Sequence, residues 1–274
     1  SGKNPVIVPA APGIYDVSLI VSNTEGTNKS TQGGLLTVSN ADAGTALHFT
    51  GTEYLKLHSP IAAETPAFTI DWWMRPSSYT GSATFSSSIF STSCAESGAV
   101  TLVLDGKKVT SDAGFVILSE WHHYAITYNA GAVTFWRDAI VFSSPTTKLG
   151  TTSPAWEGDV VIGSETDSFN GLMDELRIWS TAFDEEAIRR YCNAPIADIA
   201  SAQADDGLCV YYDFNQNGGN VIDRTSNSLD ALRVNFGPDG DAWNSALGVF
   251  TLDLEAEPSG DISARYLTNY QRPY

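Results

Sequence analysis

Residues 68–75 carry side-chain types that can bind a sugar. Their alternation predicts a strand, and successive residues of a strand point to opposite faces. One face is apolar, whereas the other combines an aromatic ring with polar groups: Thr69, Asp71, Trp73 and Arg75. A ring can stack on a sugar while carboxylate and guanidinium groups hydrogen-bond its hydroxyls. We expect Asp71, Trp73 and Arg75 to bind ligand, with packing inside the protein as the alternative.

Two further tryptophans are candidates for the same role. Trp136 alternates with Thr134 and Asp138, so a strand here would add its ring to a mixed face of the same kind. Trp156 lies in a Pro-Ala-Trp-Glu-Gly segment that predicts a loop, where an exposed ring can serve binding. Packing within the loop is the alternative for Trp156.

Two pairs of adjacent residues have the chemistry of a metal or catalytic site but the wrong spacing. His122 and His123 fall in one predicted strand, so they diverge and do not share a metal ion. Asp174 and Glu175 diverge in the same way, whereas a retaining glycosidase holds two carboxyl groups about 5–5.5 Å apart. We expect both pairs to be structural and the protein not to be an enzyme.

The composition excludes several partners. Fifteen Lys and Arg against 32 Asp and Glu give a net charge of −17, and the cations are scattered along the chain. We therefore expect neither nucleic acid nor an anionic membrane surface as a partner. Heparin-like glycans are disfavoured for the same reason. No apolar run approaches the roughly 18 residues of a transmembrane helix.

The three cysteines are too few for a disulfide framework. A single bridge between Cys192 and Cys209 is one interpretation. Three buried thiols are the alternative, because free cysteine often packs as a small apolar residue.

The remaining sequence predicts short strands separated by turns rich in Gly, Asn, Asp and Ser. One segment, residues 184–191, predicts a helix, with Asp184 as its N-cap and with acidic and basic residues at the ends where the helix dipole favours them. The expected fold class is all-β, with two antiparallel sheets in a sandwich and one short helix.

In this order the segments resemble the laminin-G-like, concanavalin-A-like lectin and glucanase jelly rolls. The resemblance covers about 46–236, and its most specific part is a strand-and-helix unit at 161–191. Other matching segments are 49–57, 68–76, 121–128, 133–138 and 208–214. The resemblance implies a jelly-roll sandwich. The glucanase members carry a Glu-x-Asp-x-x-Glu strand, which this sequence lacks.

The same resemblance implies a candidate calcium site. Residues 163–169 are similar to the loop with which pentraxins, distant members of the fold, supply Glu and Asp oxygens to calcium, and the matching residues are Glu165 and Asp167. Calcium takes about 6–8 oxygens, and the second pentraxin element, an Asp-Asn pair, is missing. Ca²⁺ is thus a candidate cofactor, with a solvated acidic turn as the alternative.

The sequence predicts four parts. Strand patterns on either side of a turn predict a hairpin in the first part, which resembles the last two strands of a PKD-type immunoglobulin-like domain. The expected parts are this hairpin at 1–38, a linker at 39–45, the jelly roll at 46–236, and an extension at 237–274 that packs on or trails the sandwich. A PKD-like unit before such a jelly roll resembles surface lipoproteins of Bacteroidota.

These interpretations favour a non-catalytic binding module, extracellular or at the cell surface, that recognises a neutral glycan. A structural or adhesion module that contacts an extracellular protein is the alternative. A glycoside hydrolase is the third choice.

Overall fold

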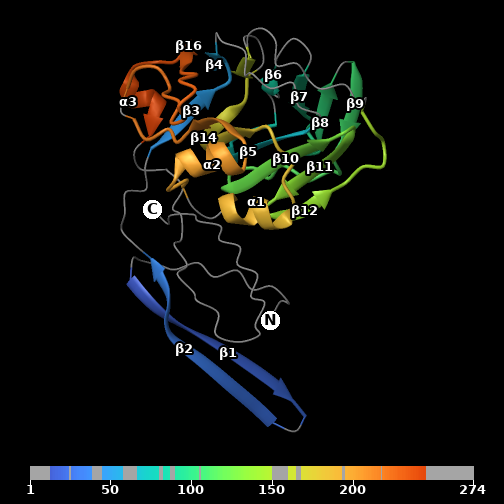
Figure 1. Cartoon of the computed structure of the whole chain (residues 1–274), viewed down its shortest axis with the longest axis vertical. Helices are drawn as coiled ribbons and strands as arrows, with labels where there is room; N and C mark the ends of the chain where they lie inside the picture. Colours follow the sequence, from blue (N-terminus) through green and yellow to red (C-terminus); the bar gives the residue numbers. More distant parts are fainter. Residues whose placement is uncertain are drawn as a thin grey trace.

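The protein folds into a sandwich of two antiparallel sheets (Figure 1). The structure is a computed structural model, and it describes residues 13–24, 26–38, 45–57, 67–79, 83–86, 90–104, 106–149, 160–164, 168–192, 195–216 and 218–244. The sandwich confirms the expected all-β fold class. Within the described residues, the search for a helix long and apolar enough to cross a membrane finds none.

The larger sheet has the strand order β12-β11-β10-β5-β14-β3-β17, and β15 pairs with β14 beside this path. Its central strand pairs are β10 with β5 and β5 with β14, all antiparallel. The strands are β3 (Ala46–Thr50), β5 (Ala67–Pro76), β10 (His122–Asn129), β11 (Ala132–Arg137), β12 (Ile140–Ser143), β14 (Asn170–Trp179), β15 (Leu208–Tyr212) and β17 (Trp243–Asn244).

The smaller sheet has the order β16-β4-β13-β6-β7-β8-β9. Several of its strands alternate between buried and more exposed residues, as expected for a sheet with one face on the core. The strands are β4 (Tyr54–Leu57), β6 (Ala83–Ser86), β7 (Phe90–Cys94), β8 (Val100–Leu104), β9 (Lys107–Thr110), β13 (Val160–Gly163) and β16 (Ala231–Val234).

The main core lies between the two sheets. The apolar face predicted for residues 68–75 points into it, and Phe68, Ile70 and Trp72 are at most 2% exposed. Trp72 of the larger sheet meets Phe85 of the smaller sheet edge to face, with ring centroids 4.9 Å apart. Each large apolar side chain buried in this way contributes about 1.5–3 kcal/mol, so this layer holds the sheets together.

The described residues form three helices beside the sheets, whereas the sequence analysis expected one. Helix α1 (Glu185–Cys192) confirms that expectation, and its N-cap Asp184 accepts a hydrogen bond from the Ala187 amide at 2.9 Å. Helices α2 (Ile199–Asp205) and α3 (Asp239–Ala242) were not predicted. Asp198 caps α2 by accepting from the Ser201 amide, so an N-cap before an Ala-rich run was the missed signal.

The first and the last strands of the described part of the chain differ in their pairing with the sandwich. Strands β1 (Gly13–Asn23) and β2 (Gly26–Val38) pair only with each other and form a two-stranded sheet. At the other end, β17 pairs with β3, and its Trp243 is 5% exposed in the main core. The residues up to 244 therefore complete the larger sheet.

The three cysteines are free thiols, so of the two interpretations left open the one with a Cys192–Cys209 bridge is wrong. Cys192 packs into the apolar layer beneath α1, whereas Cys209 packs against the core between the sheets. The larger sheet separates these two layers, which keeps the sulfur atoms apart. The alternative interpretation as thiols holds, although Cys94 and Cys209 are only partly buried.

Candidate functional site

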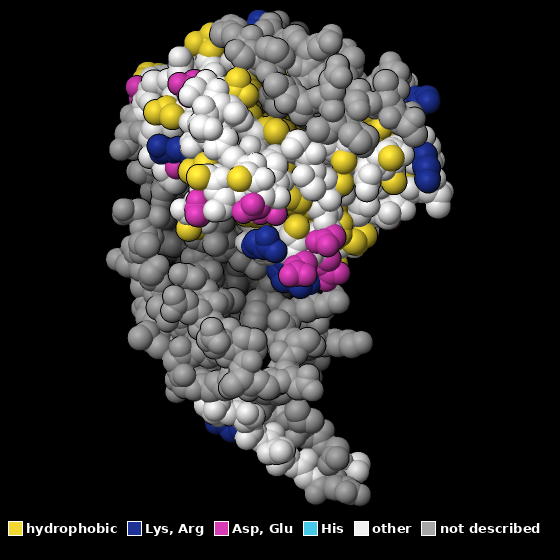
Figure 2. Space-filling view, viewed as in Figure 1, with side chains coloured by type: hydrophobic (Ala, Val, Ile, Leu, Met, Phe, Trp, Pro, Cys, Tyr) yellow, Lys and Arg dark blue, Asp and Glu magenta, His cyan; other side chains and the backbone are white. Residues whose placement is uncertain are grey.

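The mixed polar and aromatic face of β5 is covered by α1 rather than open to solvent. Figure 1 shows α1 and α2 on one side of the larger sheet. The apolar side of α1, with Ile188 and Cys192, packs against Trp73 and Trp179, and these side chains form a second apolar layer. Figure 2 shows charged side chains of both signs on the outer surface in this region. The amphipathic helix α1 thus covers the face of β5 that the sequence predicted to bind a ligand.

Trp73 holds the last turn of α1. Its side chain is 2% exposed, and its Nε1–H donates to the backbone oxygen of Cys192 at 3.2 Å. The ring also meets the His123 ring edge to face, with centroids 5.7 Å apart. For Trp73 the structure therefore favours the packing alternative over a sugar contact.

Asp71 is the centre of a buried hydrogen-bond network. Its Oδ1 accepts from His123 Nε2 at 3.0 Å and from Arg177 Nη1 at 3.1 Å, and its Oδ2 accepts from Trp179 Nε1 at 2.6 Å. Asp71 is 1% exposed. Because both carboxylate oxygens have protein donors and no route to solvent, Asp71 has a structural role here.

Arg177 joins this network to α1 and to a second carboxylate. Its Nη2 donates to Glu175 Oε2 at 2.5 Å, and its Nη1 donates to the backbone oxygen of Tyr191 in the last turn of α1. The Tyr211 hydroxyl donates to the same Glu175 oxygen at 2.7 Å. Burial lowers the pKa of Arg177, but Asp71 and Glu175 raise it by more, so the guanidinium stays charged. Burial raises the pKa of Glu175, and Arg177 opposes that shift.

A β-bulge places Glu175 in the network. Between β14 and β5, Asp174 pairs with Trp73 and Arg177 pairs with Asp71, so β14 has one extra residue. Glu175 occupies this position with a φ of +50°, an uncommon conformation for a residue with a side chain. The Asp174 carboxylate stabilises it by accepting from the Glu175 amide at 2.8 Å. Strand alternation could not reveal that Glu175 and Asp71 share Arg177 as their hydrogen-bond donor.

The two histidines bind different carboxylates, as their adjacent positions predicted. His123 faces Asp71, whereas His122 Nδ1 lies 2.7 Å from Asp138 Oδ2. Asp138 also accepts from the His123 amide at 3.1 Å, so it fixes the start of β10. Within the described part of the chain, no group of three or more His, Cys, Asp or Glu side chains could hold a metal ion.

The remaining residues predicted to bind a ligand or calcium are either buried, half-buried or outside the described part of the chain. Trp136 is 6% exposed and its Nε1 donates to Thr127 Oγ1 at 3.0 Å, so packing is favoured for it as well. Arg75 is half-buried, and its Nε donates to the Ser119 carbonyl at 3.2 Å. Trp156, Glu165 and Asp167 lie outside the described residues.

The residues around the candidate calcium loop are fixed to the β3–β4 turn. Ser168, which follows the loop, donates from Oγ to the Glu53 carbonyl at 2.5 Å and from its amide to the Gly51 carbonyl at 3.2 Å. Before the loop, Gly163 has a φ of +94°, and a Cβ there would lie 2.5 Å from Ser168 Oγ. This close approach requires glycine. The Glu53 carboxylate is 7% exposed and already binds Thr50 and Thr52.

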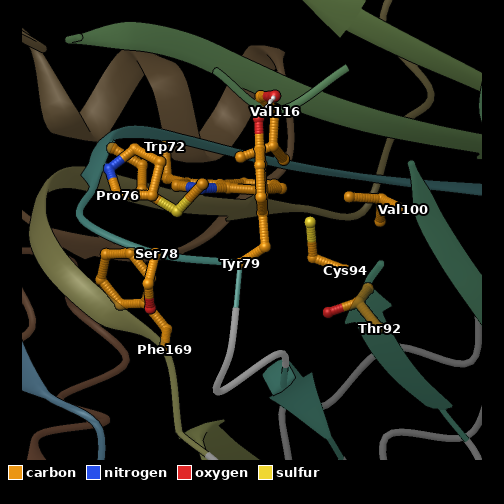
Figure 3. A pocket seen from close by; sticks show the side chains of 10 residues that line it. Trp72, Pro76, Ser78, Tyr79, Thr92, Cys94, Val100, Val116 and Phe169 are labelled. Atoms are coloured by element: carbon orange, nitrogen blue, oxygen red, sulfur yellow. Dashed lines mark hydrogen bonds between the residues drawn. The ribbon is translucent and has the colours of Figure 1, made fainter. Parts of the chain in front are cut away.

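A small cavity lies between the sheets, and it is too small for a sugar (Figure 3). Its volume is about 20 Å³, which is room for about one water molecule. Trp72, Cys94 and Tyr79 line it together with apolar neighbours. Among the described residues, the buried Trp72 Nε1–H has no hydrogen-bond partner.

The smaller sheet also has an outer face, which the sequence analysis did not describe. The inward residues of its strands, such as Leu55, Ile162 and Leu102, are fully buried in the main core. The residues between them are half-buried or exposed, and the outer face consists of Tyr54, Lys56, Ser91, Ser93, Thr101, Val103, Lys108, Thr110, Val161, Leu232 and Val234. The partial alternation of apolar and polar residues at 54–57 and 100–104 could have predicted this outer face from the sequence.

Comparison with known proteins identifies the fold. A family described as concanavalin A-like lectin/glucanases superfamily matches residues 49–189. A Bacteroides ovatus protein, whose description proposes carbohydrate binding, is similar over 80% of this chain and 67% of its own, at 18% identity and a TM-score of 0.57. A heptameric SAP-like pentraxin from Limulus polyphemus is similar over 62% of this chain and 93% of its own, at 15% identity and a TM-score of 0.43. No curated protein matches the chain.

Proposed function

The chain belongs to the concanavalin A-like lectin/glucanases superfamily, and from this membership we propose that it is a non-catalytic module that binds a glycan. The observation that carries the non-catalytic part is the burial of the candidate carboxylates. Asp71, Asp174 and Glu175 are at most 4% exposed, and Arg177 links Asp71 and Glu175 to α1. The carboxyl groups of a glycosidase must flank the bond that they cleave, and these cannot reach a substrate without displacement of the helix.

The proposed class of ligand rests on the family to which the chain belongs and on the chain's net charge. The Bacteroides ovatus protein that shares the fold is described in terms of carbohydrate binding, and this motivates a glycan as the ligand. The net charge of −17 favours a neutral glycan over a densely sulfated one. We place the module outside the cell or at the cell surface, with the β1–β2 hairpin as the end of a PKD-type domain. Contact with an extracellular protein is the alternative function.

Arg75 and Trp156 remain the proposed ligand residues from the sequence. Arg75 keeps part of its side chain exposed at the end of β5, and Trp156 follows from its loop sequence. Glu165 and Asp167 remain a proposed calcium site. Calcium there would bind next to Ser168, which is held to the β3–β4 turn by two hydrogen bonds.

A panel of neutral oligosaccharides, measured by isothermal titration calorimetry, tests this function. We expect at least one to bind, and we expect Trp156→Ala to weaken that binding about 3- to 10-fold through loss of ring stacking. Trp243→Phe, a change in the described core, is the control and should leave affinity unchanged. Failure of every glycan to bind would overturn the proposal, and binding to a protein ligand alone would favour the adhesion alternative.

A further inference from the structure

The outer face of the larger sheet is not buried equally along its strands. In β5, Asp71 and Trp73 are at most 2% exposed, whereas Arg75, on the same face and next in the alternation, is half-buried. In β3, His48 is also half-buried. The buried part of this face therefore ends between Trp73 and Arg75, and the residues beyond it can meet a ligand without displacement of α1.

Strand pairing places His48, Leu172 and Arg75 side by side on this face. Leu172 of β14 pairs with His48 of β3 on one side and with Arg75 of β5 on the other. All three point outward, because their strand neighbours belong to the core between the sheets, and these neighbours include Leu47, Phe49, Met173 and Met74. Neighbouring strands are about 4.8 Å apart, so the backbones of His48 and Arg75 are about 10 Å apart. One sugar unit over Leu172 can therefore touch both side chains.

Polar residues border this row at the end of the sheet. Thr50 pairs with Asn170, and the Asn170 carbonyl accepts from the Ser77 amide at 2.8 Å. Thr50 and Ser77 are exposed and Asn170 is half-buried, whereas Leu172 is 6% exposed and belongs to the second apolar layer. An apolar centre surrounded by hydroxyl, amide and imidazole groups suits a sugar, because the ring lies over the apolar side chain while its hydroxyls form hydrogen bonds.

The Arg75 guanidinium is fixed by one hydrogen bond and keeps the two nitrogen atoms with which arginine binds a carboxylate. Its Nε donates to the Ser119 carbonyl at 3.2 Å, and no described residue binds its Nη1 or Nη2. Five other arginines of the described residues pair with Asp or Glu, and they are Arg177, Arg189, Arg190, Arg224 and Arg233. A guanidinium holds a carboxylate best through two parallel N–H bonds. Arg75 is thus suited to a carboxylate that a ligand supplies.

The acidic side chains near this row in the sequence have partners of their own. Glu120 follows Ser119, and its Oε2 lies 3.4 Å from His122 Nε2. Glu53 is 7% exposed, and its Oε1 accepts from the Thr50 hydroxyl at 2.6 Å. The row itself contains His48 and Arg75 but no carboxylate, which suits an anionic group on the ligand. The net charge of −17 would repel a ligand with many such groups, so it favours one with few.

We propose that His48, Leu172 and Arg75 form a subsite for one carboxylated sugar unit, a uronic acid, in an otherwise neutral glycan. This inference rests on the proposed glycan-binding function and names a subsite and the chemical class of the sugar that occupies it. The carboxylate pairs with Nη1 and Nη2 of Arg75, a hydroxyl group binds the His48 ring, and the sugar ring lies over Leu172. Arg75 thereby distinguishes the acid from the neutral sugar.

The test compares the methyl glycosides of glucuronic, galacturonic and mannuronic acid with those of glucose, galactose and mannose, by NMR titration of ¹⁵N-labelled protein at low salt. At least one acid should bind about 3- to 10-fold more tightly than its neutral counterpart. The amide signals of His48, Leu172 and Arg75 should shift with it. Shifts confined to other strands, equal binding within all three pairs, or no binding of any acid would each overturn the inference. The panel of neutral oligosaccharides then decides the proposed function separately.

Variants assign the preference to Arg75. Arg75→Gln should remove it, and Arg75→Lys, which keeps the charge but lacks two parallel N–H groups, should lose most of it. His48→Ala should weaken binding of acid and neutral sugar alike, by about 3-fold. Arg190→Gln, at a side chain of α1 that is 55% exposed, makes the same change in net charge and should keep the preference.

Thermal melting shows which variants are folded. A preference that persists in folded Arg75→Gln protein, or in Arg75→Lys at full size, would overturn the role of Arg75. Loss of the preference in Arg190→Gln would assign it to the overall charge and would also overturn the inference.

Discussion

Arg177 and Asp71 form an ion pair that is fully enclosed between the larger sheet and α1. Nη1 lies 3.1 Å from Oδ1, and the two side chains are 0% and 2% exposed. The same Nη1 donates to the Tyr191 carbonyl, so the pair links the sheet to the last turn of the helix. Asp71, which the sequence suggested as a ligand residue, thus helps to hold α1 on the sheet.

Replacement of Arg177 should destabilise the protein strongly. Arg177→Met leaves Asp71 and Glu175 buried without their cation, and loss of one partner of a buried pair costs about 3–5 kcal/mol. Urea unfolding measures the free energy of unfolding. Arg189→Met breaks the partly exposed pair with Glu185, which has an N–O distance of 2.5 Å, and should cost less than about 1 kcal/mol. Equal costs for the two variants would contradict the structural role of Arg177.

Trp73→Phe should lower stability without affecting ligand affinity. The change keeps an aromatic ring in the layer under α1 but removes the hydrogen bond from Nε1 to the Cys192 carbonyl. We expect a loss of about 1 kcal/mol in the free energy of unfolding. Calorimetry with a bound glycan should give an unchanged dissociation constant. A large drop in affinity with unchanged stability would mean that α1 leaves the sheet and Trp73 meets the ligand.

Glu53 should make stability dependent on acid pH. Burial alone would raise the pKa of Glu53, but hydrogen bonds from Thr50 and Thr52 together outweigh it and lower the pKa. A lowered pKa in the folded state gives stability that is present above the unfolded pKa of about 4.3 and is lost as the pH falls through the folded pKa. Glu53→Gln should therefore be about 1–2 kcal/mol less stable at neutral pH.

Urea unfolding of both proteins between about pH 7 and pH 2 checks this dependence. The difference between wild type and Glu53→Gln should shrink as the pH falls below the unfolded pKa of about 4.3. A difference that stays constant over this range would show that the carboxylate charge of Glu53 contributes nothing.

The cysteines should react slowly in the folded protein. Burial raises the pKa of Cys94 to about 11, so its thiol is almost entirely protonated at pH 8. Burial also raises the pKa of Cys192 well above its ordinary value. Ellman's reagent without reductant should titrate three thiols in urea and react much more slowly in native buffer. One thiol in urea would instead show that a bridge forms.

Calcium should raise the melting temperature if Glu165 and Asp167 bind it. Binding to the folded state alone stabilises by about 2.7 kcal/mol when calcium is 100-fold above its dissociation constant. Thermal melting with and without millimolar calcium measures the shift, and Glu165→Gln with Asp167→Asn should abolish it. Magnesium at the same concentration is the control for ionic strength. The absence of any shift in the wild-type protein would exclude this site.

Strand β5 and helix α1 could be predicted from the sequence because each depends on a local pattern of residues. Alternation at 68–75 predicted β5 and its apolar face, and Asp184 with its flanking charges predicted α1. The short helices α2 and α3 were missed because seven and four residues carry little periodic signal. The β-bulge at Glu175 was missed because an extra residue in one strand is defined only by its partner strand.

The sequence by itself determined the fold class and the two faces of each strand, because side-chain alternation is a property of the extended chain. It also determined the acidity that disfavours polyanions. Only the tertiary structure decided which face of the larger sheet α1 covers, since that depends on contacts between residues more than 100 positions apart, such as Trp73 with Cys192. The same packing buries Asp71 and Trp73, which the sequence suggested as ligand residues, and uses both of them to hold α1 on the larger sheet.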